Sequence, residues 1–329
     1  MSPHPGLADF ERARAALAGR IRRTPARPSP ALAARLGAPV VLKHEHEQTT
    51  GAFKLRGATN ALATLSDAER ARGVVTVSTG NHGRALAHAA REVGVRCVVA
   101  MSRLVPQNKL DAIAALGAEI AIHGASQDEA QGEVDRRVAE EGLVEIPPFD
   151  NPDVIAGQGT LGLELVEDVP DLAQVLIPLS GGGLAAGVAA AVKAQRPSAR
   201  IVGISMERGA AMQASLAAGR PVLVEEAESL ADSLGGGIGL ENRHTFAMLR
   251  DLMDEVVLLT EDEIAAGIAF CHAVEGVVVE GGGAVGPGAI LAGKIHPHGP
   301  TVAILSGRNI DPALHARIVS DPAVLERLA

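Results

Sequence analysis

The chain has 329 residues, a formal net charge of -9 and only 2% aromatic residues, with no Trp and no Tyr. A core of this composition must be built from Ala, Leu, Val and Ile, which favours closely packed helices against a Val/Ile sheet. The acidic balance argues against a nucleic-acid partner, because such partners need a concentrated basic face. The length allows two domains, or one with a large insertion, and a small-molecule partner is expected.

The cysteines and the N-terminus indicate the compartment. Cys97 and Cys271 lie in apolar contexts with neither metal-ligand spacing nor disulfide density, and are typical of reduced thiols. Asp9 and Glu11 interrupt the region where a signal peptide would be apolar, and no later run reaches ~18 apolar residues without Gly, Pro or charge. We therefore expect a cytoplasmic protein without a membrane partner.

The first 65 residues are predicted to be mostly helical. An amphipathic helix is expected over 8–21, and Arg23-Thr24-Pro25 ends it. A short helix ending at Gly37 follows, then a strand over 40–43 and a helix from residue 54 to about 65. The segment that leads to Lys54 directly follows this strand.

From residue 74 onward, strands alternate with helices. Apolar runs predict strands at 74–77, 95–100, 119–122 and 143–146, with helices between them. After the break at Pro147 to Pro152, a helix is expected over about 159–167. Further strands are expected at 175–179, 201–205, 256–259 and 302–305. This alternation predicts an α/β fold with right-handed βαβ units and parallel sheets.

Lys54 stands directly behind an aromatic ring at the predicted start of a helix. A lysine amine attacks an aldehyde only when unprotonated, so a reactive lysine needs surroundings that lower its pKa. Phe53 and Leu55 could supply apolar walls, and Arg56 a positive neighbour. Lys54 is therefore a candidate covalent anchor for a cofactor, although a lone lysine beside a phenylalanine is more often a solvated charge.

Glycines follow a predicted strand at Ser180 to Gly183 and precede a helix. Such a loop lets backbone N–H groups point at one anion, and the helix dipole adds to the attraction. The loop lacks the Lys-Ser/Thr ending of a nucleotide P-loop and the spacing of a dinucleotide fold. A tight turn is the simpler explanation, but three successive glycines favour the phosphate of a small cofactor.

Three further segments end predicted strands or apolar runs with polar groups. Ser78 to His82 could present N–H groups and hydroxyls to a carboxylate, with Asn81 offering an amide, or could be an ordinary turn. Ser306 could bond a heterocyclic nitrogen without adding charge. Glu280 follows an apolar run and is either a partly buried acid or a helix cap.

Lys54, a phosphate-binding loop, the Asn81 amide and the Ser306 hydroxyl are together the groups expected in a binding site for pyridoxal phosphate. Ala52-Phe53-Lys54-Leu55-Arg56-Gly57-Ala58 matches the motif Ser-Phe-Lys-x-Arg-Gly-Ala, and residues 78–82 match Ser-x-Gly-Asn-His. With Ser306-Gly307-x-Asn309 and the glycine loop in the same order, the chain resembles the fold-type II pyridoxal-phosphate enzymes. The resemblance is to the branch of threonine/serine dehydratases and serine racemase, and covers nearly the whole chain.

The resemblance implies a tryptophan-synthase-β-like fold of two three-layer αβα domains. The large domain would span 1–72 and 150–329, and the small mobile domain, 73–149, would close over substrate in a homodimer. Lys54 would hold the cofactor and act as base at the α-carbon, Phe53 would lie against the ring, and Ser306 would bond the ring nitrogen. The other implied cofactor residues are Asn81 (at O3′), Ser180, Gly181, Gly182, Gly183, Leu184 and Glu280. The implied substrate residues are Ser78, Thr79, Gly80, Asn81, His82 and Arg84.

The neutral serine implies an unprotonated ring nitrogen, a weaker electron sink that favours loss of a β-substituent. The implied reaction eliminates water from a β-hydroxy-α-amino acid, and the enamine hydrolyses to a keto acid and ammonia. Thr79 replaces the serine that racemases place on the second face, and Arg84 replaces a glutamine. Glu280-Gly281-Gly282-Gly283-Ala284 replaces Glu-Pro-x-Gly-Ala. These variants look most like the hydroxyectoine-utilisation dehydratases.

Three alternatives stay open at this point. The chain could be an amino-acid racemase or a non-catalytic cofactor-binding protein, whereas β-replacement is disfavoured because the glycine loop lacks threonines.

Glu207 and Ala211 match positions that bind a divalent cation in some relatives. Gln213 replaces the acidic third ligand there, and an amide weakens a site for a hard cation. No metal is therefore expected.

Overall fold

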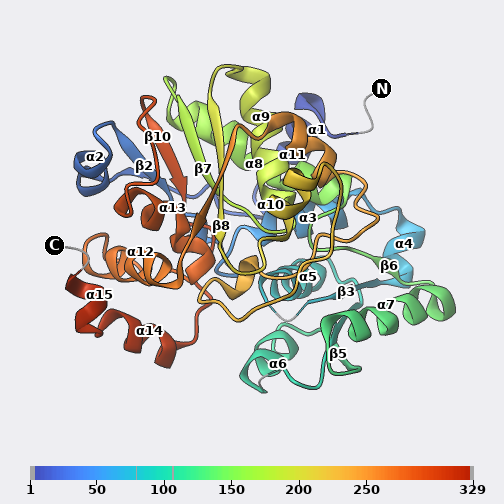
Figure 1. Cartoon of the computed structure of the whole chain (residues 1–329). Helices are drawn as coiled ribbons and strands as arrows, with labels where there is room; N and C mark the ends of the chain where they lie inside the picture. Colours follow the sequence, from blue (N-terminus) through green and yellow to red (C-terminus); the bar gives the residue numbers. More distant parts are fainter. Residues whose placement is uncertain (1–3, 79, 106, 327–329) are drawn as a thin grey trace.

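The computed structural model describes residues 4–78, 80–105 and 107–326, which fold around two β-sheets (Figure 1). The larger sheet has six strands in the order β1-β2-β10-β7-β8-β9, and β1 pairs antiparallel with β2 while the other pairs are parallel. Its strands are β1 (Ala26–Pro28), β2 (Val40–Lys43), β7 (Gln174–Pro178), β8 (Arg200–Met206), β9 (Glu255–Leu259) and β10 (Thr301–Ile304). The second sheet has four parallel strands in the order β5-β4-β3-β6. These are β3 (Val74–Val77), β4 (Cys97–Met101), β5 (Glu119–Ile122) and β6 (Val144–Glu145).

Helices cover both sheets. In chain order they are α1 (Leu7–Leu17), α2 (Pro30–Leu36), α3 (Lys54–Thr64), α4 (Asp67–Arg72), α5 (Asn81–Glu92), α6 (Gln107–Ala114), α7 (Gln127–Glu141), α8 (Pro152–Asp168), α9 (Gly183–Gln195), α10 (Ala211–Ala218), α11 (Thr245–Leu252), α12 (Glu261–Ala273), α13 (Gly281–Leu291), α14 (Pro312–Val319) and α15 (Pro322–Glu326). Two 3₁₀ turns, η1 (Glu45–Glu47) and η2 (Asp232–Leu234), lie in connecting segments. The alternation of strands and helices confirms the predicted α/β fold with parallel sheets.

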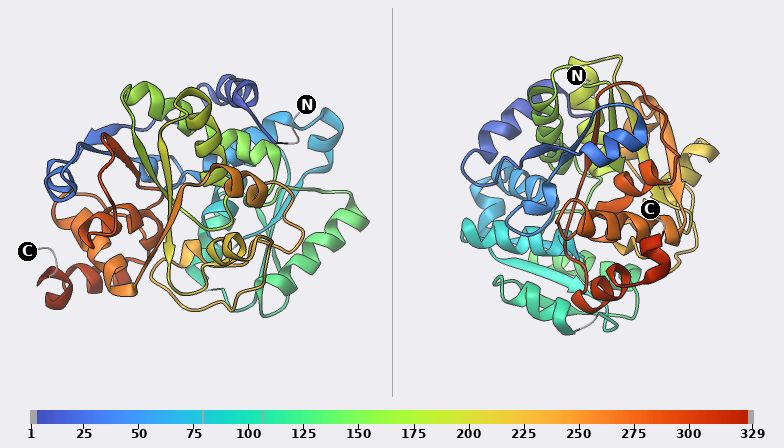
Figure 2. Two further views of the ribbon diagram at one scale, coloured as in Figure 1. Left: turned by 45° about the horizontal axis from the view of Figure 1, so that its top comes forward. Right: turned by 90° about the vertical axis from the view of Figure 1, so that its left-hand side faces the viewer.

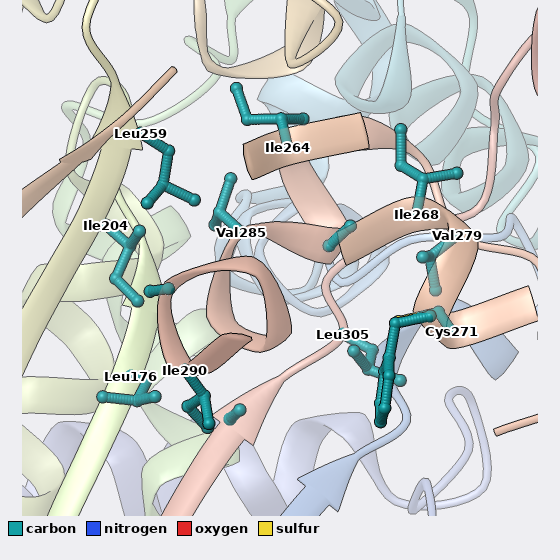
Figure 3. Close-up of a cluster of buried hydrophobic side chains, with 14 of the residues drawn as sticks. Leu176, Ile204, Leu259, Ile264, Ile268, Cys271, Val279, Val285, Ile290 and Leu305 are labelled. Atoms are coloured by element: carbon teal, nitrogen blue, oxygen red, sulfur yellow. The ribbon is translucent and has the colours of Figure 1, made fainter. Parts of the chain in front are cut away.

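Alternation along the strands builds a core on each face of the six-stranded sheet. Val175 and Ile177 of β7 pack with α8, α9 and α11, whereas Leu176 packs on the other face with α12 and α13. This follows from the two-residue period of a strand, because successive side chains point to opposite faces. Figure 3 shows the second core, with Leu176 and Ile204 of the strands facing Val285 of α13. Helices α14 and α15 pack beside α12 (Figure 2).

The four-stranded sheet is covered in the same way. Val99 and Met101 of β4 share a core with α5 and α6, and Val98 and Ala100 share the opposite core with α7. Helix α3 contributes Leu55 and three further apolar residues to the α5 side. Lys54, the residue before Leu55, is the first residue of this helix. That residues 73–149 form a mobile domain remains a prediction.

Several predicted boundaries need correction. The helix predicted to begin near residue 159 begins at Pro152, because proline fits the first turn of a helix and the Asn151 side chain caps it. The strand predicted at 95–100 spans Cys97–Met101, and α5 begins at Asn81, which places Asn81 in the first turn of that helix. Capping boxes at Ser66 and Thr260 begin α4 and α12. Across the described residues, we find no helix with the length and apolar character needed to cross a membrane.

Candidate active site

One pocket lies where strands of both sheets end. Ser78 follows β3, Ser180 follows β7 and Ser306 follows β10, and all three line it. The carboxyl ends of parallel strands are the usual place for a ligand in α/β proteins. The predicted residues that line this pocket are Phe53, Lys54, Ser78, Gly80, Asn81, His82, Arg84, Ser180, Gly181, Gly182, Gly183, Leu184, Glu280 and Ser306. Thr79 lies outside the described residues, and Glu207 and Ala211 are not among the lining residues.

Lys54 is the first residue of α3, and its ammonium reaches into the pocket. Its Nζ donates a 2.6 Å hydrogen bond to the carbonyl oxygen of Pro148 and lies 5.4 Å from the centre of the Phe53 ring. Burial lowers the pKa of Lys54 to about 8, because the charged form loses solvation. The amine is therefore partly unprotonated near neutral pH, as a reactive lysine requires.

The expectation that Arg56 lowers this pKa is wrong. Arg56 is fully buried and points away from the pocket into two carboxylates. Its guanidinium donates two hydrogen bonds of 2.8 Å to Glu45, and bonds of 2.7 and 2.9 Å to Glu164. Burial rather than a neighbouring cation accounts for the shift at Lys54. Leu55 is likewise buried in the core beside the four-stranded sheet and forms no pocket wall.

The Arg56 cluster extends to a second buried cation. Lys43 Nζ lies 2.8 Å from carboxylate oxygens of both Glu164 and Asp168, and the Thr24 hydroxyl donates to Glu45. Paired, bidentate contacts of this kind fix an arginine in one orientation. The cluster anchors the first turn of α3 and thereby Lys54, whose amine lies in the pocket.

The glycine loop joins β7 to α9 and has no room for side chains. A Cβ atom on Gly181 would come within 2.4 Å of the Phe149 ring, and one on Gly183 within 2.9 Å of the Phe149 Cα. Gly182 has a φ of +93°, a backbone conformation that favours glycine. The Thr245 hydroxyl donates a 2.8 Å bond to the Gly181 carbonyl oxygen and holds the loop. The loop therefore presents bare backbone at the N-terminus of a helix, which suits a phosphate.

Glu280 is a buried acid that joins segments from both sheets. It occupies the N-cap position of α13, but its side chain does not cap the helix. Instead, Glu280 Oε1 accepts a 2.6 Å bond from the Asn81 amide, and Oε2 accepts a 3.0 Å bond from the Asn309 backbone N–H. Burial, assisted by the charge of Asp232, raises the pKa of Glu280 to about 7. Of the two roles expected from the sequence, the structure therefore favours the buried acid.

Ser306 supplies a buried hydroxyl and is tied to the lysine segment. Its Oγ donates to the Gly282 carbonyl oxygen at 3.3 Å, and its own carbonyl oxygen accepts a 3.0 Å bond from the Phe53 N–H. The residue before Lys54 is thus held directly by the strand end that carries the hydroxyl. This bond fixes the Lys54 segment relative to the Ser306 hydroxyl.

The segment between β3 and α5 is organised by Ser78, whose Oγ accepts a 3.0 Å bond from the Gly83 N–H. His82 is buried, and its Nε2 bonds the Ile146 carbonyl oxygen at 2.9 Å. Burial, and then the charge of Lys54, lowers the pKa of His82 to about 3, so the ring is neutral. Arg84 lies one turn along α5, with Nη1 3.4 Å from Asn309 Oδ1.

Sequence reasoning missed a second glycine loop in this pocket. Residues 232–237 line it, and the Ser233 side chain interacts with Glu280. The signal was a serine followed closely by Gly235-Gly236-Gly237, much like the first loop. It was overlooked because no predicted strand precedes it directly. Pro148 and Phe149 were noted only as a chain break, yet both line the pocket.

Comparison with known proteins identifies the family. A family model described as pyridoxal-phosphate dependent enzyme matches residues 17–307. The chain belongs to this family. It is 58% identical over 315 residues to a putative threonine dehydratase of Sinorhizobium fredii, covering 95% of each chain. It is 38% identical over 306 residues to a catabolic L-threonine dehydratase of Escherichia coli, covering 92% of each.

A solved structure supports the same assignment. Maize serine racemase superposes with a TM-score of 0.90 at 33% sequence identity, over 95% of this chain and 96% of that one. The expected fold-type II architecture is confirmed by this match and by the family model. With threonine dehydratases and ammonia-lyases among its relatives, the chain is a pyridoxal-phosphate-dependent lyase of that type.

The residues of the pocket fit the cofactor of this family. Lys54 can anchor its aldehyde, and the bare backbone of the glycine loop can take its phosphate. Phe53 lies beside the amine, and Ser306 offers a hydroxyl without charge. An anchor, an anion cradle and a neutral polar group thus line the same cavity.

Proposed function

We propose that this lyase removes water from a β-hydroxy-α-amino acid to give an enamine, which hydrolyses to a keto acid and ammonia. One observation carries the proposal. A single pocket gathers a lysine of lowered pKa, a side-chain-free helix N-terminus and a neutral serine hydroxyl. Pyridoxal phosphate, when bound there, supplies the electron-withdrawing ring that stabilises negative charge at the α-carbon.

Residues of the chain then accept the α-proton and bind the substrate carboxylate. Lys54 Nζ accepts the α-proton, which is possible because burial keeps part of the amine unprotonated. The N-terminus of α5, with Ser78 and Gly80, binds the substrate carboxylate through hydroxyl and backbone N–H groups. Neutral His82 adds no charge there. Thr79, which lies outside the described residues, is proposed as a hydroxyl on the opposite face.

Arg84 supports a finer proposal about the substrate side chain. It lines the active-site pocket and also a neighbouring hollow that contains His88, Arg91 and Arg308. This concentration of basic groups favours a substrate whose side chain carries an acidic or acyl group. We therefore propose a hydroxyectoine-type dehydratase, acting on an acylated hydroxy-diaminobutyrate or a related compound.

A screen of keto-acid and ammonia release tests both levels of the proposal. Serine, threonine, 3-hydroxyaspartate and N-acylated hydroxy-diaminobutyrate are compared with the wild type and with Arg84→Gln. We expect the acidic or acylated substrates to be preferred, and Arg84→Gln to lower kcat/KM for them by about tenfold while sparing serine. Preference for serine or threonine, unchanged by Arg84→Gln, would leave the lyase proposal standing and refute the finer one.

A racemase is the second candidate, because maize serine racemase superposes on this chain so closely. Chiral analysis of the products from an L-hydroxy amino acid separates the two. The lyase proposal predicts that keto acid accumulates before any D-isomer. D-isomer formed ahead of keto acid would favour the racemase instead.

We also propose that the enzyme works as a homodimer in the cytoplasm. Cys97 and Cys271 are both free rather than joined in a disulfide, which fits a reducing compartment. Light scattering after size exclusion checks the dimer, and a mass of about one chain would contradict it.

A further inference from the structure

Two histidines and a glutamate gather at turn η1, between β2 and the segment that leads to Lys54. Each of His44, His46 and Glu47 offers one ligand atom, and the three atoms lie within 4.8 Å of one another. His44 Nδ1 is 3.7 Å from Glu47 Oε1. Elsewhere in the described residues, no other three His, Cys, Asp or Glu side chains meet this condition. The cluster is separate from the residues that line the active site.

The two imidazoles are buried with nitrogens that have no partner. His44 and His46 are each 3% exposed, and His46 Nδ1 and His44 Nε2 make no hydrogen bond. An unsatisfied buried polar atom is unfavourable and needs an explanation. An imidazole nitrogen that makes no hydrogen bond is available to coordinate a metal ion.

The backbone holds these rings in place. The His44 N–H donates to the Pro25 carbonyl oxygen at 3.0 Å, and the His46 N–H to the Leu305 carbonyl oxygen at 2.8 Å. Between them, Glu45 points the other way and binds Arg56. The turn is therefore fixed before any ligand arrives.

A cation already stands among the ligand atoms. Arg27 Nη1 lies 2.7 Å from Glu47 Oε1 and 3.4 Å from His44 Nδ1. The Arg27 side chain is 53% exposed and Glu47 is 30% exposed, so the guanidinium can swing into solvent and open a path to the site. Arg27 therefore competes with any bound cation for the Glu47 carboxylate.

We propose that His44, His46 and Glu47 bind one divalent transition-metal ion of the Zn²⁺ class when Arg27 releases the Glu47 carboxylate. Two imidazoles and one carboxylate suit Zn²⁺, Ni²⁺ or Cu²⁺, whereas Mg²⁺ and Ca²⁺ prefer oxygen ligands. Three protein ligands leave a fourth position for water. The site is independent of the proposed reaction, because none of its residues lines the active-site pocket.

Zinc titration of the tag-free, metal-stripped holoenzyme tests the site, with a chromophoric chelator as competitor. We expect one Zn²⁺ per chain, with affinity at least about tenfold lower in Glu47→Gln and His46→Asn. Arg27→Gln should raise the affinity, because it removes the competing cation. His272→Gln is the matched control, since the His272 and His315 rings also lie 5.2 Å apart, as the His44 and His46 rings do.

Because His46 is buried, His46→Asn can fold poorly. In that case Glu47→Gln is the deciding variant, because Glu47 is partly exposed. Thermal melts followed by circular dichroism verify that each variant is folded. Co²⁺ substitution should give the visible bands of a four-coordinate ion in the wild type and lose them in Glu47→Gln. Zinc affinity that is unchanged in Glu47→Gln, or not raised in Arg27→Gln, would overturn the proposal.

Discussion

Two buried clusters, one around Arg56 and one around Glu280, differ in how their acids are paired. In the first, burial alone would raise the pKa of Glu45, but the charge and hydrogen bonds of Arg56 outweigh burial and lower it. In the second, Glu280 receives hydrogen bonds from Asn81 and Asn309, and burial raises its pKa to about 7. Arg56 thus keeps Glu45 ionised in the cluster that holds α3, whereas Glu280 can change its protonation near neutral pH.

The largest effect on stability is expected at Arg56. Arg56→Ala leaves the Glu45 and Glu164 carboxylates buried without their partner, so the free energy of unfolding should fall by about 3–5 kcal/mol. Urea unfolding measures the change. Arg56→Lys keeps the charge but cannot make the paired contacts, and should recover only part of the loss. Near-wild-type stability in Arg56→Ala would show that the cluster does not hold α3.

Glu280 should make stability depend on pH in the opposite sense to a paired acid. Its pKa is about 7 in the folded protein against 4.5 as the ordinary value, so the folded state binds more protons between these pH values. The free energy of unfolding should therefore fall by roughly 3 kcal/mol as pH rises from about 4.5 to 7, and then level off. Glu280→Gln should flatten this part of the profile. Urea unfolding at several pH values checks it, and an unchanged profile in the variant would contradict the assignment.

A smaller effect is expected from the hydroxyl that supports Glu45. Thr24→Val keeps the side-chain shape but removes a hydrogen bond to a buried carboxylate, which should lower the free energy of unfolding by about 1.5 kcal/mol. Arg56 still neutralises Glu45 in this variant, so the loss should stay well below that of Arg56→Ala. Equal losses in the two variants would mean that pairing with Arg56 is not what distinguishes this cluster.

The α/β fold and most of the pocket were predictable, because they depend on local patterns. Strand ends followed by Ser78, Ser180 and Ser306 had to meet at one edge of each parallel sheet. Arg56 was misplaced because two residues along a helix lie about 200° apart, so Arg56 faces away from Lys54. Its carboxylate partners come from a turn and from α8, which no local pattern brings together.

The second glycine loop, residues 232–237, could not be predicted as part of the pocket. Residues 232–237 reach the pocket only because the long connection between β8 and β9 folds back over α13. Likewise, the raised pKa of Glu280 comes from burial and from Asp232, 48 positions earlier in the sequence. Such effects depend on tertiary contacts, and the sequence pattern carries no direct signal for them.

The most direct test of the central claim is keto-acid release by wild type and Lys54→Ala, both supplied with pyridoxal phosphate and the best hydroxy amino acid. The claim is that the Lys54 amine, held by the Arg56 cluster, takes the α-proton. We predict equal amounts of keto acid and ammonia from the wild type, and a rate at least about 10²-fold lower in folded Lys54→Ala. A folded Lys54→Ala that releases keto acid at the wild-type rate would contradict the account.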